Sequence, residues 1–211
     1  MITVKFKKVR ENATMPEKAY DTSVGYDLTA AHVEYKPEID TYVYYIGLAT
    51  ETNVDTSTVP HQIHGEFCFT GSRNRKTECY LANSVGIIDS DEYRGEIQLS
   101  YKNRTSLETM IKMETLNQVM HRLYDQQSMT NLGMGSTFGR MKYEDIYDFI
   151  YRQVKQKFIE RATNLEFAPY KQGDVVGQMV FATTEPVIIQ EVEELNMNTE
   201  RGTGGHGSTK K

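Results

Sequence analysis

The chain has 211 residues, of which 38% are hydrophobic and 25% are charged, as expected for a globular domain with a buried core. Its net charge of -5 and the lack of a dominant basic stretch argue against a nucleic-acid partner. No apolar run is long enough to span a bilayer and the first residues are typical of a strand, so we expect a cytoplasmic protein without a membrane partner.

Short runs of β-branched and aromatic residues, separated by turn formers, occur in the first hundred residues and again near the C-terminus. They are TVKFKKV (3–9), TYVYYIGLA (41–49), HQIHGEFCF (61–69), EIQLSYK (96–102), DVVGQMVFAT (174–183) and EPVIIQEVEE (185–194). These runs predict a mainly β core of short strands. Cys68 and Cys79 lack metal-ligand spacing, and we expect both to be reduced, buried thiols.

Between residues 104 and 166 the pattern changes to that of helices. The segment TSLE, from Thr105 to Glu108, has capping-box spacing. Apolar residues then recur at helical spacing, first at Met110, Met113, Leu116, Met120 and Leu123, and later at Ile146, Phe149, Ile150, Val154, Phe158 and Ile159. The connector NLGMGSTFGR lacks the lysine of a P-loop and follows a helix, which favours a turn. Because β-type sequence resumes at Asp174, we predict a helical hairpin inserted into the β domain.

Four further segments carry residues suited to chemistry. The strand-like run VGII (85–88) ends at Asp89, where a carboxylate on rigid support can face a pocket and accept a proton from water. An Asp that opens a turn is the alternative. The segments GYDL (25–28) and GDVVGQ (173–178) are each compatible with a simple turn or a loop before a strand. The tail RGTGGHGST (201–209) is too rich in glycine to hold a helix or a strand by itself.

Five segments of the chain resemble, in the same order, the five motifs of the trimeric dUTPase family, the deoxyuridine triphosphate nucleotidohydrolases. They are AYDTSVGYDLTA, GSRNRK, NSVGIIDSDEYRGE, GDVVGQMVF and RGTGGHGST. The resemblance covers roughly residues 19–103 and 170–209. It implies a mainly β fold, a distorted jelly-roll-like β barrel of the β-clip type with an inserted α-helical hairpin. The implied parts are a discontinuous β-barrel core (1–103 and 167–200), a helical insertion (104–166) and a flexible glycine-rich arm (201–211).

The activity that the resemblance implies is hydrolysis of dUTP to dUMP and pyrophosphate, which limits uracil in DNA. Asp89 is implied to orient and deprotonate the water that attacks the α-phosphorus. The family's Mg2+ grips the triphosphate, and Asp27 is implied to hold this ion through water. The spacing DSDEY places Tyr93 one residue further from Asp89 than in the family. A bulge at this point, or a share of the role for Asp91, is therefore open.

The base and the sugar are implied to be recognised by the third motif. A hairpin from Asn83 to Gly86 would read the uracil edge through backbone groups, and Tyr93 would leave no room for a 2'-hydroxyl. A partly buried strand aromatic is the alternative for Tyr93.

The phosphate chain is implied to accept hydrogen bonds from Ser72 and Gln178. The family has an arginine directly before the motif-two serine, whereas this sequence has Gly71 there. Arg73 is the candidate to reach the phosphates from a shifted position, with Arg75 as the alternative.

The C-terminal arm is implied to fold over bound nucleotide as a lid. The implied contacts are Arg201 at the γ-phosphate, the backbone of Gly204, Gly205 and Gly207, and the side chains of His206 and Ser208. His206 stands where the family has a stacking phenylalanine, so we expect weaker or pH-dependent lid closure.

The family's site is assembled from three chains, which implies a homotrimer with shared active sites. The insertion either packs on itself and on the barrel or presents a surface to a partner protein, as in some phage-encoded relatives. Two other functions are open. A dCTP deaminase of the same fold would need a glutamate near the base, such as Glu92 or Glu96, and a regulatory nucleotide-binding protein would keep the fold with reduced catalysis.

Overall fold

The computed structural model describes residues 2–54, 63–69, 75–88, 93–131, 142–184 and 189–193. The strands in these ranges are β1 (Ile2–Lys8), β2 (Tyr26–Thr29), β3 (His32–Lys36), β4 (Thr41–Tyr45), β5 (Leu48–Val54), β6 (Ile63–Phe69), β7 (Cys79–Leu81), β8 (Gly86–Ile88), β9 (Gln98–Asn103) and β10 (Val175–Thr184). The helices are α1 (Leu107–Asn131) and α2 (Tyr143–Thr163). Both helices lie between β9 and β10 in the chain, as predicted for an inserted hairpin.

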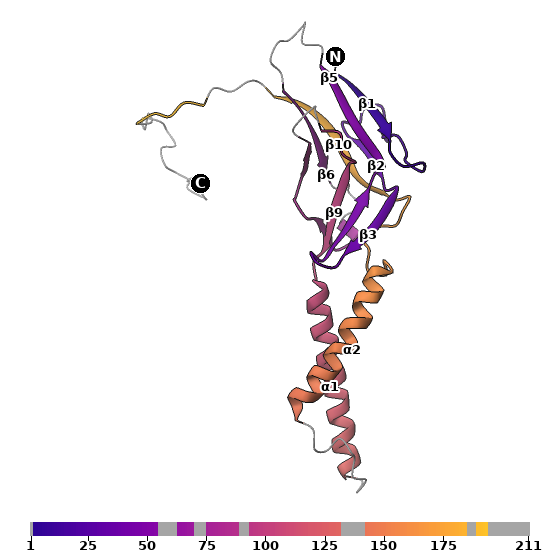
Figure 1. Cartoon of the computed structure of the whole chain (residues 1–211), viewed down its shortest axis with the longest axis vertical. Coiled ribbons are helices and arrows are strands. Elements are labelled where there is room, and N and C mark those ends of the chain that lie inside the picture. The colour runs from indigo at the N-terminus through magenta and orange to yellow at the C-terminus, as the bar shows by residue number, and fades with distance from the viewer. Residues whose placement is uncertain are drawn as a thin grey trace, which may run out of the picture.

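The described strands form three antiparallel sheets, with the orders β1-β5, β2-β10-β6-β8 and β3-β4-β9-β7. Figure 1 shows these sheets together at one end of the molecule, with α1 and α2 projecting from them as a hairpin. Within the described residues the sheets do not join into one closed barrel. The mainly β, jelly-roll-like architecture with inserted helices is confirmed.

The predicted strand over 41–49 is in fact two strands. The chain turns after Ile46 at Gly47, which has φ +76°, and a Cβ there would lie 2.7 Å from the Cβ of Ala13. Only glycine fits this turn, so the run of strand-forming residues divides into β4 and β5. The strand predicted over 185–194 is also wrong in its described part, because residues 189–193 form none.

The core lies where the sheets face each other. Its largest fully buried side chains come from the strands, from the turns between them and from both helices: Leu28, Thr41, Tyr44, Ile46, Leu48, Leu99, Tyr101, Ile111, Val119, Ile150, Val176 and Met179. Burying such side chains stabilises the fold by roughly 1.5–3 kcal/mol each. Cys68 and Cys79 are buried and form no disulfide, as predicted.

Helix α1 is capped one residue later than predicted. Ser106, and not Thr105, provides the cap, since its Oγ accepts a hydrogen bond from the backbone N–H of Thr109 at 3.2 Å. A second acceptor comes from far away in sequence, because Oδ2 of Asp40 accepts from the backbone N–H of Leu107 at 2.9 Å. The turn between β3 and β4 therefore fixes the start of the helical hairpin.

The apolar stripe predicted for α1 is confirmed only in part, because Met110 and Leu123 pack against the core. Met113, Leu116 and Met120 are exposed, whereas the helix buries Leu107, Ile111, Thr115 and Val119, spaced four residues apart. The sequence did not indicate this stripe because Thr115 is polar. Its hydroxyl donates to the backbone oxygen of Ile111 at 2.7 Å, which allows it to be buried without an unmet hydrogen bond.

The stripe predicted for α2 is largely confirmed. Ile146, Ile150 and Val154 are buried, and Phe158 and Ile159 pack against the core, whereas Phe149 is exposed. In the described part of the chain, neither helix combines the length and the apolar character needed to cross a membrane.

A tyrosine cluster ties the chain after α2 back to the sheets. The rings of Tyr44, Tyr101 and Tyr170 contact one another edge to face, with centroids 5.3–5.8 Å apart. The Tyr44 hydroxyl donates to the backbone oxygen of Tyr170 and accepts from its N–H, each at 3.0 Å. Burial raises the pKa of both Tyr44 and Tyr101, so both remain neutral hydrogen-bonding groups.

Candidate functional site

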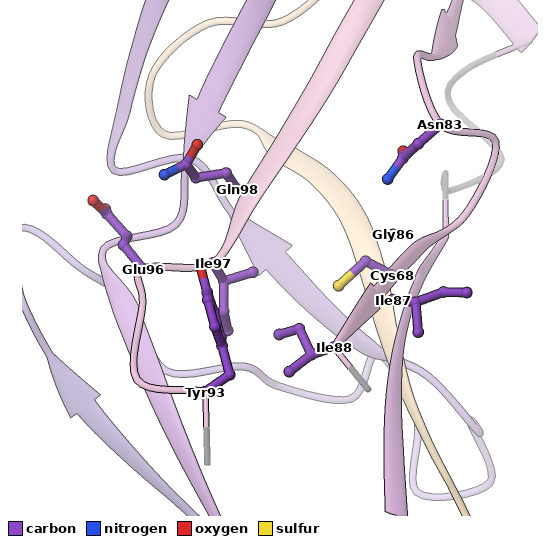
Figure 2. A pocket seen from close by; sticks show the side chains of 9 residues that line it. All are labelled: Cys68, Asn83, Gly86, Ile87, Ile88, Tyr93, Glu96, Ile97 and Gln98. Atoms are coloured by element: carbon purple, nitrogen blue, oxygen red, sulfur yellow. The ribbon is translucent and has the colours of Figure 1, made fainter. Parts of the chain in front are cut away.

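A cavity of about 350 Å³ opens between β6, β8 and the chain that leads into β9. It is lined by Cys68, Asn83, Gly86, Ile87, Ile88, Tyr93, Glu96, Ile97 and Gln98. Figure 2 shows the Tyr93 side chain beside Ile97, with Ile88, Cys68 and Asn83 across the cavity. Three residues predicted to contact the base and sugar, Asn83, Gly86 and Tyr93, are thus brought to one cavity.

The turn that carries Asn83 and Gly86 connects two different sheets. β7 pairs with β9, whereas β8 pairs with β6, so the segment is not the β-hairpin that the motif suggested. The turn is nevertheless tight, since Ser84 has φ +63° and the N–H of Val85 donates to the oxygen of Asn83 at 2.6 Å. The N–H of Ser84 also donates to the oxygen of Leu81 at 2.9 Å, so two hydrogen bonds fix the backbone of this turn.

Gly86 is needed because β8 lies very close to β6. Gly86 is the direct register partner of Cys68, and a Cβ at position 86 would lie 3.1 Å from the Cβ of Cys68. A side chain at position 86 would require its neighbour Cys68 to shift by a few tenths of an ångström. The Cβ of Cys68 is the other side of this close contact, a role that the sequence did not indicate for this cysteine.

Glu96 is held in place by the N-terminal segment. Its carboxylate accepts from Nε and Nη2 of Arg10 at 2.6 and 3.0 Å, and from the backbone N–H of Gly47 at 2.9 Å. Hydrogen bonding to Glu96 raises the pKa of Arg10. Because Arg10 and Gly47 already engage both carboxylate oxygens, Glu96 is poorly placed to orient an attacking water, which argues against it as a general base for deamination.

A second group of predicted residues meets at the β2–β10 pair. Asp27 and Gln178 are direct register partners, and Nε2 of Gln178 donates to Oδ1 of Asp27 at 2.8 Å. Gly25 leaves room for this side chain, since a Cβ there would lie 3.2 Å from both the Cβ and the Oε1 of Gln178. Asp27 lies within a strand, not in the turn that GYDL left open.

The two groups occupy different parts of one sheet. Asp27 and Gln178 lie on β2 and β10, and Gly86 lies on β8 at the far edge of the order β2-β10-β6-β8. Two strand spacings, roughly 10 Å, separate β10 from β8. Among the described residues, neither Asp27 nor Gln178 lines the cavity.

The remaining predicted site residues lie outside the described ranges. They are Ser72, Arg73, Asp89, Asp91, Glu92, Arg201, Gly204, Gly205, His206, Gly207 and Ser208. β8 ends at Ile88, so the described chain reaches the residue before Asp89. Arg75 is described and is exposed, away from the cavity lining.

Among the described residues, no group of three or more His, Cys, Asp or Glu side chains is arranged to hold a metal ion. One side-chain oxygen of Asp27 accepts a hydrogen bond from Gln178. This oxygen donor fits an indirect contact to Mg2+ through water better than a complete protein cage, since Mg2+ keeps several waters when phosphates bind it.

The fold is that of dUTPases from Staphylococcus phages. A mutant of the phage 80alpha dUTPase has a TM-score of 0.55 at 16% sequence identity, over 98% of this chain and 98% of that chain. The phage 80alpha dUTPase with dUPNHPP has a TM-score of 0.54 at 16% identity, over 99% and 98%. A mutant dUTPase from phage phi11 of S. aureus, described for its coordination of a structural Mg(II) ion, has a TM-score of 0.50 at 16% identity, over 91% and 97%.

No protein-family model and no curated protein matches the sequence. The structural likeness, at 16% identity, establishes the fold and confirms the resemblance drawn from the five motifs at that level. It extends over nearly the whole chain, so the helical insertion is included in the match.

Proposed function

We propose that this chain hydrolyses dUTP to dUMP and pyrophosphate. The observation that carries the proposal is the cavity in which the Asn83–Gly86 turn and Tyr93 meet, within a fold shared with phage dUTPases. A cavity of about 350 Å³ is large enough for a base and its sugar. The 80alpha dUTPase, with the same fold, has been determined with the nucleotide dUPNHPP.

Base selection in this proposal comes from the backbone of the turn. Fixed N–H and C=O groups present a pattern of donors and acceptors that suits the uracil edge and not the cytosine edge. The close packing of Gly86 on Cys68 leaves little space to widen the turn for the methyl group of thymine. Tyr93, on the opposite wall, contacts the deoxyribose and excludes a 2'-hydroxyl.

In the chemical step, Asp89 accepts a proton from a water molecule while the water oxygen attacks the α-phosphorus. The bond from the α-phosphorus to the bridging oxygen breaks, and pyrophosphate leaves with that oxygen. Ser72, Arg73 and Gln178 hold the phosphate chain in line. Arg201 and the glycine-rich segment that follows it close over the nucleotide and exclude water.

Magnesium, when bound with the triphosphate, would neutralise charge on the phosphate oxygens. Asp27 would contact it through water, and Gln178 holds Asp27 in the orientation for this contact. The support within the structure is the direct pairing of these two side chains across β2 and β10.

The separation of the two residue groups favours a shared site. The cavity contains third-motif residues, whereas Asp27 and Gln178 lie on β2 and β10 of the same chain and do not line it. We propose a homotrimer in which one chain supplies the cavity, another supplies the phosphate-binding residues, and a third supplies the arm. The core of this trimer would be residues 1–103 and 167–200, with 104–166 as an insertion outside the chemistry.

Product analysis tests the proposal. The purified protein is incubated with dUTP or dCTP in the presence of Mg2+, and pyrophosphate, dUMP and ammonia are measured. We expect equimolar pyrophosphate and dUMP from dUTP and no ammonia from dCTP. Ammonia from dCTP would replace the proposal with a deaminase, and binding of dUTP without any product would replace it with a regulatory binding protein.

A further inference from the structure

Gly95 lies two residues after Tyr93, and the tyrosine ring fills the space where a side chain at position 95 would begin. A Cβ built on Gly95 would lie 2.1 Å from the Tyr93 hydroxyl oxygen, 2.3 Å from Cζ and 2.8 Å from Cε2. These are the three nearest atoms to that position, and all belong to the Tyr93 ring. The ring is therefore folded back over the backbone of Gly95.

The backbone itself does not require glycine at this position. Among the described glycines, positive φ values occur at Gly47 and Gly173, and Gly95 is not one of them. An L-residue could adopt the conformation of residue 95 without strain. The three closest contacts that a Cβ at position 95 would make are all with Tyr93.

The chain after Gly95 is too firmly held to move aside for a side chain. Glu96 is fixed by Arg10 and Gly47 through the three hydrogen bonds described above. Ile97 is buried, its N–H donates to the oxygen of Leu48 at 2.8 Å, and its oxygen accepts from the N–H of Ile46 at 3.0 Å.

The Tyr93 ring can move at much smaller cost. The side chain is 45% exposed, so another rotamer would carry it toward solvent with little loss of packing. A methyl group at position 95 therefore displaces the ring and leaves the fold intact.

We infer that Gly95 is a positioning residue that determines where the Tyr93 ring stands at the cavity wall, and thereby how strictly the site rejects a ribose. This inference rests on the proposed dUTP hydrolysis. Tyr93 acts on the sugar by occupying space, and a ring displaced by even one rotamer leaves that space open to a 2'-hydroxyl. Gly95 touches neither substrate nor water in this role.

The test compares kcat/KM for dUTP and UTP in the wild type, Gly95→Ala, Tyr93→Ala and the double variant. We expect Gly95→Ala to reduce the dUTP-to-UTP ratio by about tenfold or more, with an unchanged melting temperature. In the Tyr93→Ala background, Gly95→Ala should not change the ratio further, because the ring through which it acts is gone. An unchanged ratio in Gly95→Ala, or an equal change in both backgrounds, overturns the inference.

A crystal structure of Gly95→Ala separates this inference from the proposed function. If the wild type does not turn over dUTP, the proposed function is wrong. The position of the Tyr93 ring in the Gly95→Ala structure still tests whether Gly95 positions that ring. We expect the Tyr93 ring in a different rotamer with residues 95–97 in place. A ring that stays over residue 95 while the backbone shifts contradicts it.

Discussion

Nε2 of Gln178 donates a hydrogen bond to Oδ1 of Asp27 across 2.8 Å, although 151 positions separate the two residues in the chain. The pairing joins two motifs to which the sequence assigned separate roles, one for the metal and one for the phosphates. Because the two are direct partners in the β2–β10 register, the hydrogen bond forms as soon as the strands pair. A substitution of either residue therefore changes the hydrogen bonding of the other.

Replacing Gln178 by Leu removes the donor to Asp27. We expect a loss of about 1 kcal/mol in the free energy of unfolding, because the partly buried carboxylate loses a hydrogen bond. Asp27→Asn is the matched variant, since its side-chain oxygen can still accept from Gln178. We expect it to be more stable than Gln178→Leu and to need more Mg2+ for half-maximal turnover. Urea unfolding and a Mg2+ titration check both, and an equal Mg2+ requirement in wild type and Asp27→Asn would contradict the assigned role.

The ion pair between Glu96 and Arg10 is expected to stabilise the wall of the cavity. Glu96→Gln should lower the free energy of unfolding by about 1 kcal/mol, a modest value because Arg10 is partly in contact with solvent. Arg10→Met should cost a similar amount, and the double variant should cost clearly less than the sum. Urea unfolding of the four proteins measures the coupling, and strict additivity would show that the pair contributes nothing.

Asp40 is expected to hold the helical hairpin on the sheets. Asp40→Ala removes the acceptor for the N–H of Leu107 and for the hydroxyl of Tyr35, which donates to Oδ1 at 2.8 Å. We expect a loss of about 1–2 kcal/mol. Asp40→Asn is the control, because asparagine keeps one acceptor and tolerates the positive φ of +48° at this position. Hydrogen exchange at the first turn of α1 should be faster in Asp40→Ala than in Asp40→Asn, and equal rates would exclude the role.

Excision of residues 105–163, with a short linker in their place, should leave dUTP turnover within a few fold of the wild type. The hairpin projects away from the sheets (Figure 1), and none of its residues lines the cavity in the described part of the chain. The chain ends to be joined are close, since Nδ2 of Asn103 donates to the oxygen of Phe167 at 3.1 Å. Loss of turnover with the oligomeric state preserved would show that the insertion belongs to the site.

The sequence predicted those features of the fold that depend on residues close together in the chain. The strand that leads to Asp89 and the inserted helices follow from hydrophobic periodicity, and the order of the motifs located Asn83, Gly86 and Tyr93 at one cavity. The close contact with Cys68 gives the physical reason for glycine at position 86.

Other features depend on contacts between distant parts of the chain, for which a single sequence has no local signal. Arg10 and Glu96 are 86 positions apart. The buried face of α1 includes the polar Thr115, which apolar periodicity does not predict to be buried. Its hydroxyl donates a hydrogen bond to the backbone oxygen of Ile111 within the helix. The hairpin predicted over residues 83–86 is wrong because the pairing partners, β9 for β7 and β6 for β8, are set by the whole sheet arrangement.

Comparison of the wild type with Asp89→Asn tests the proposed chemistry most directly. Nucleotide binding is measured by calorimetry with a non-hydrolysable dUTP analogue, and turnover by pyrophosphate release from dUTP with Mg2+. We expect the variant to bind the analogue with near wild-type affinity while turnover falls by about two to four orders of magnitude, because the amide cannot accept the proton of the attacking water. Turnover by Asp89→Asn at close to the wild-type rate would contradict the assignment of Asp89 as the base.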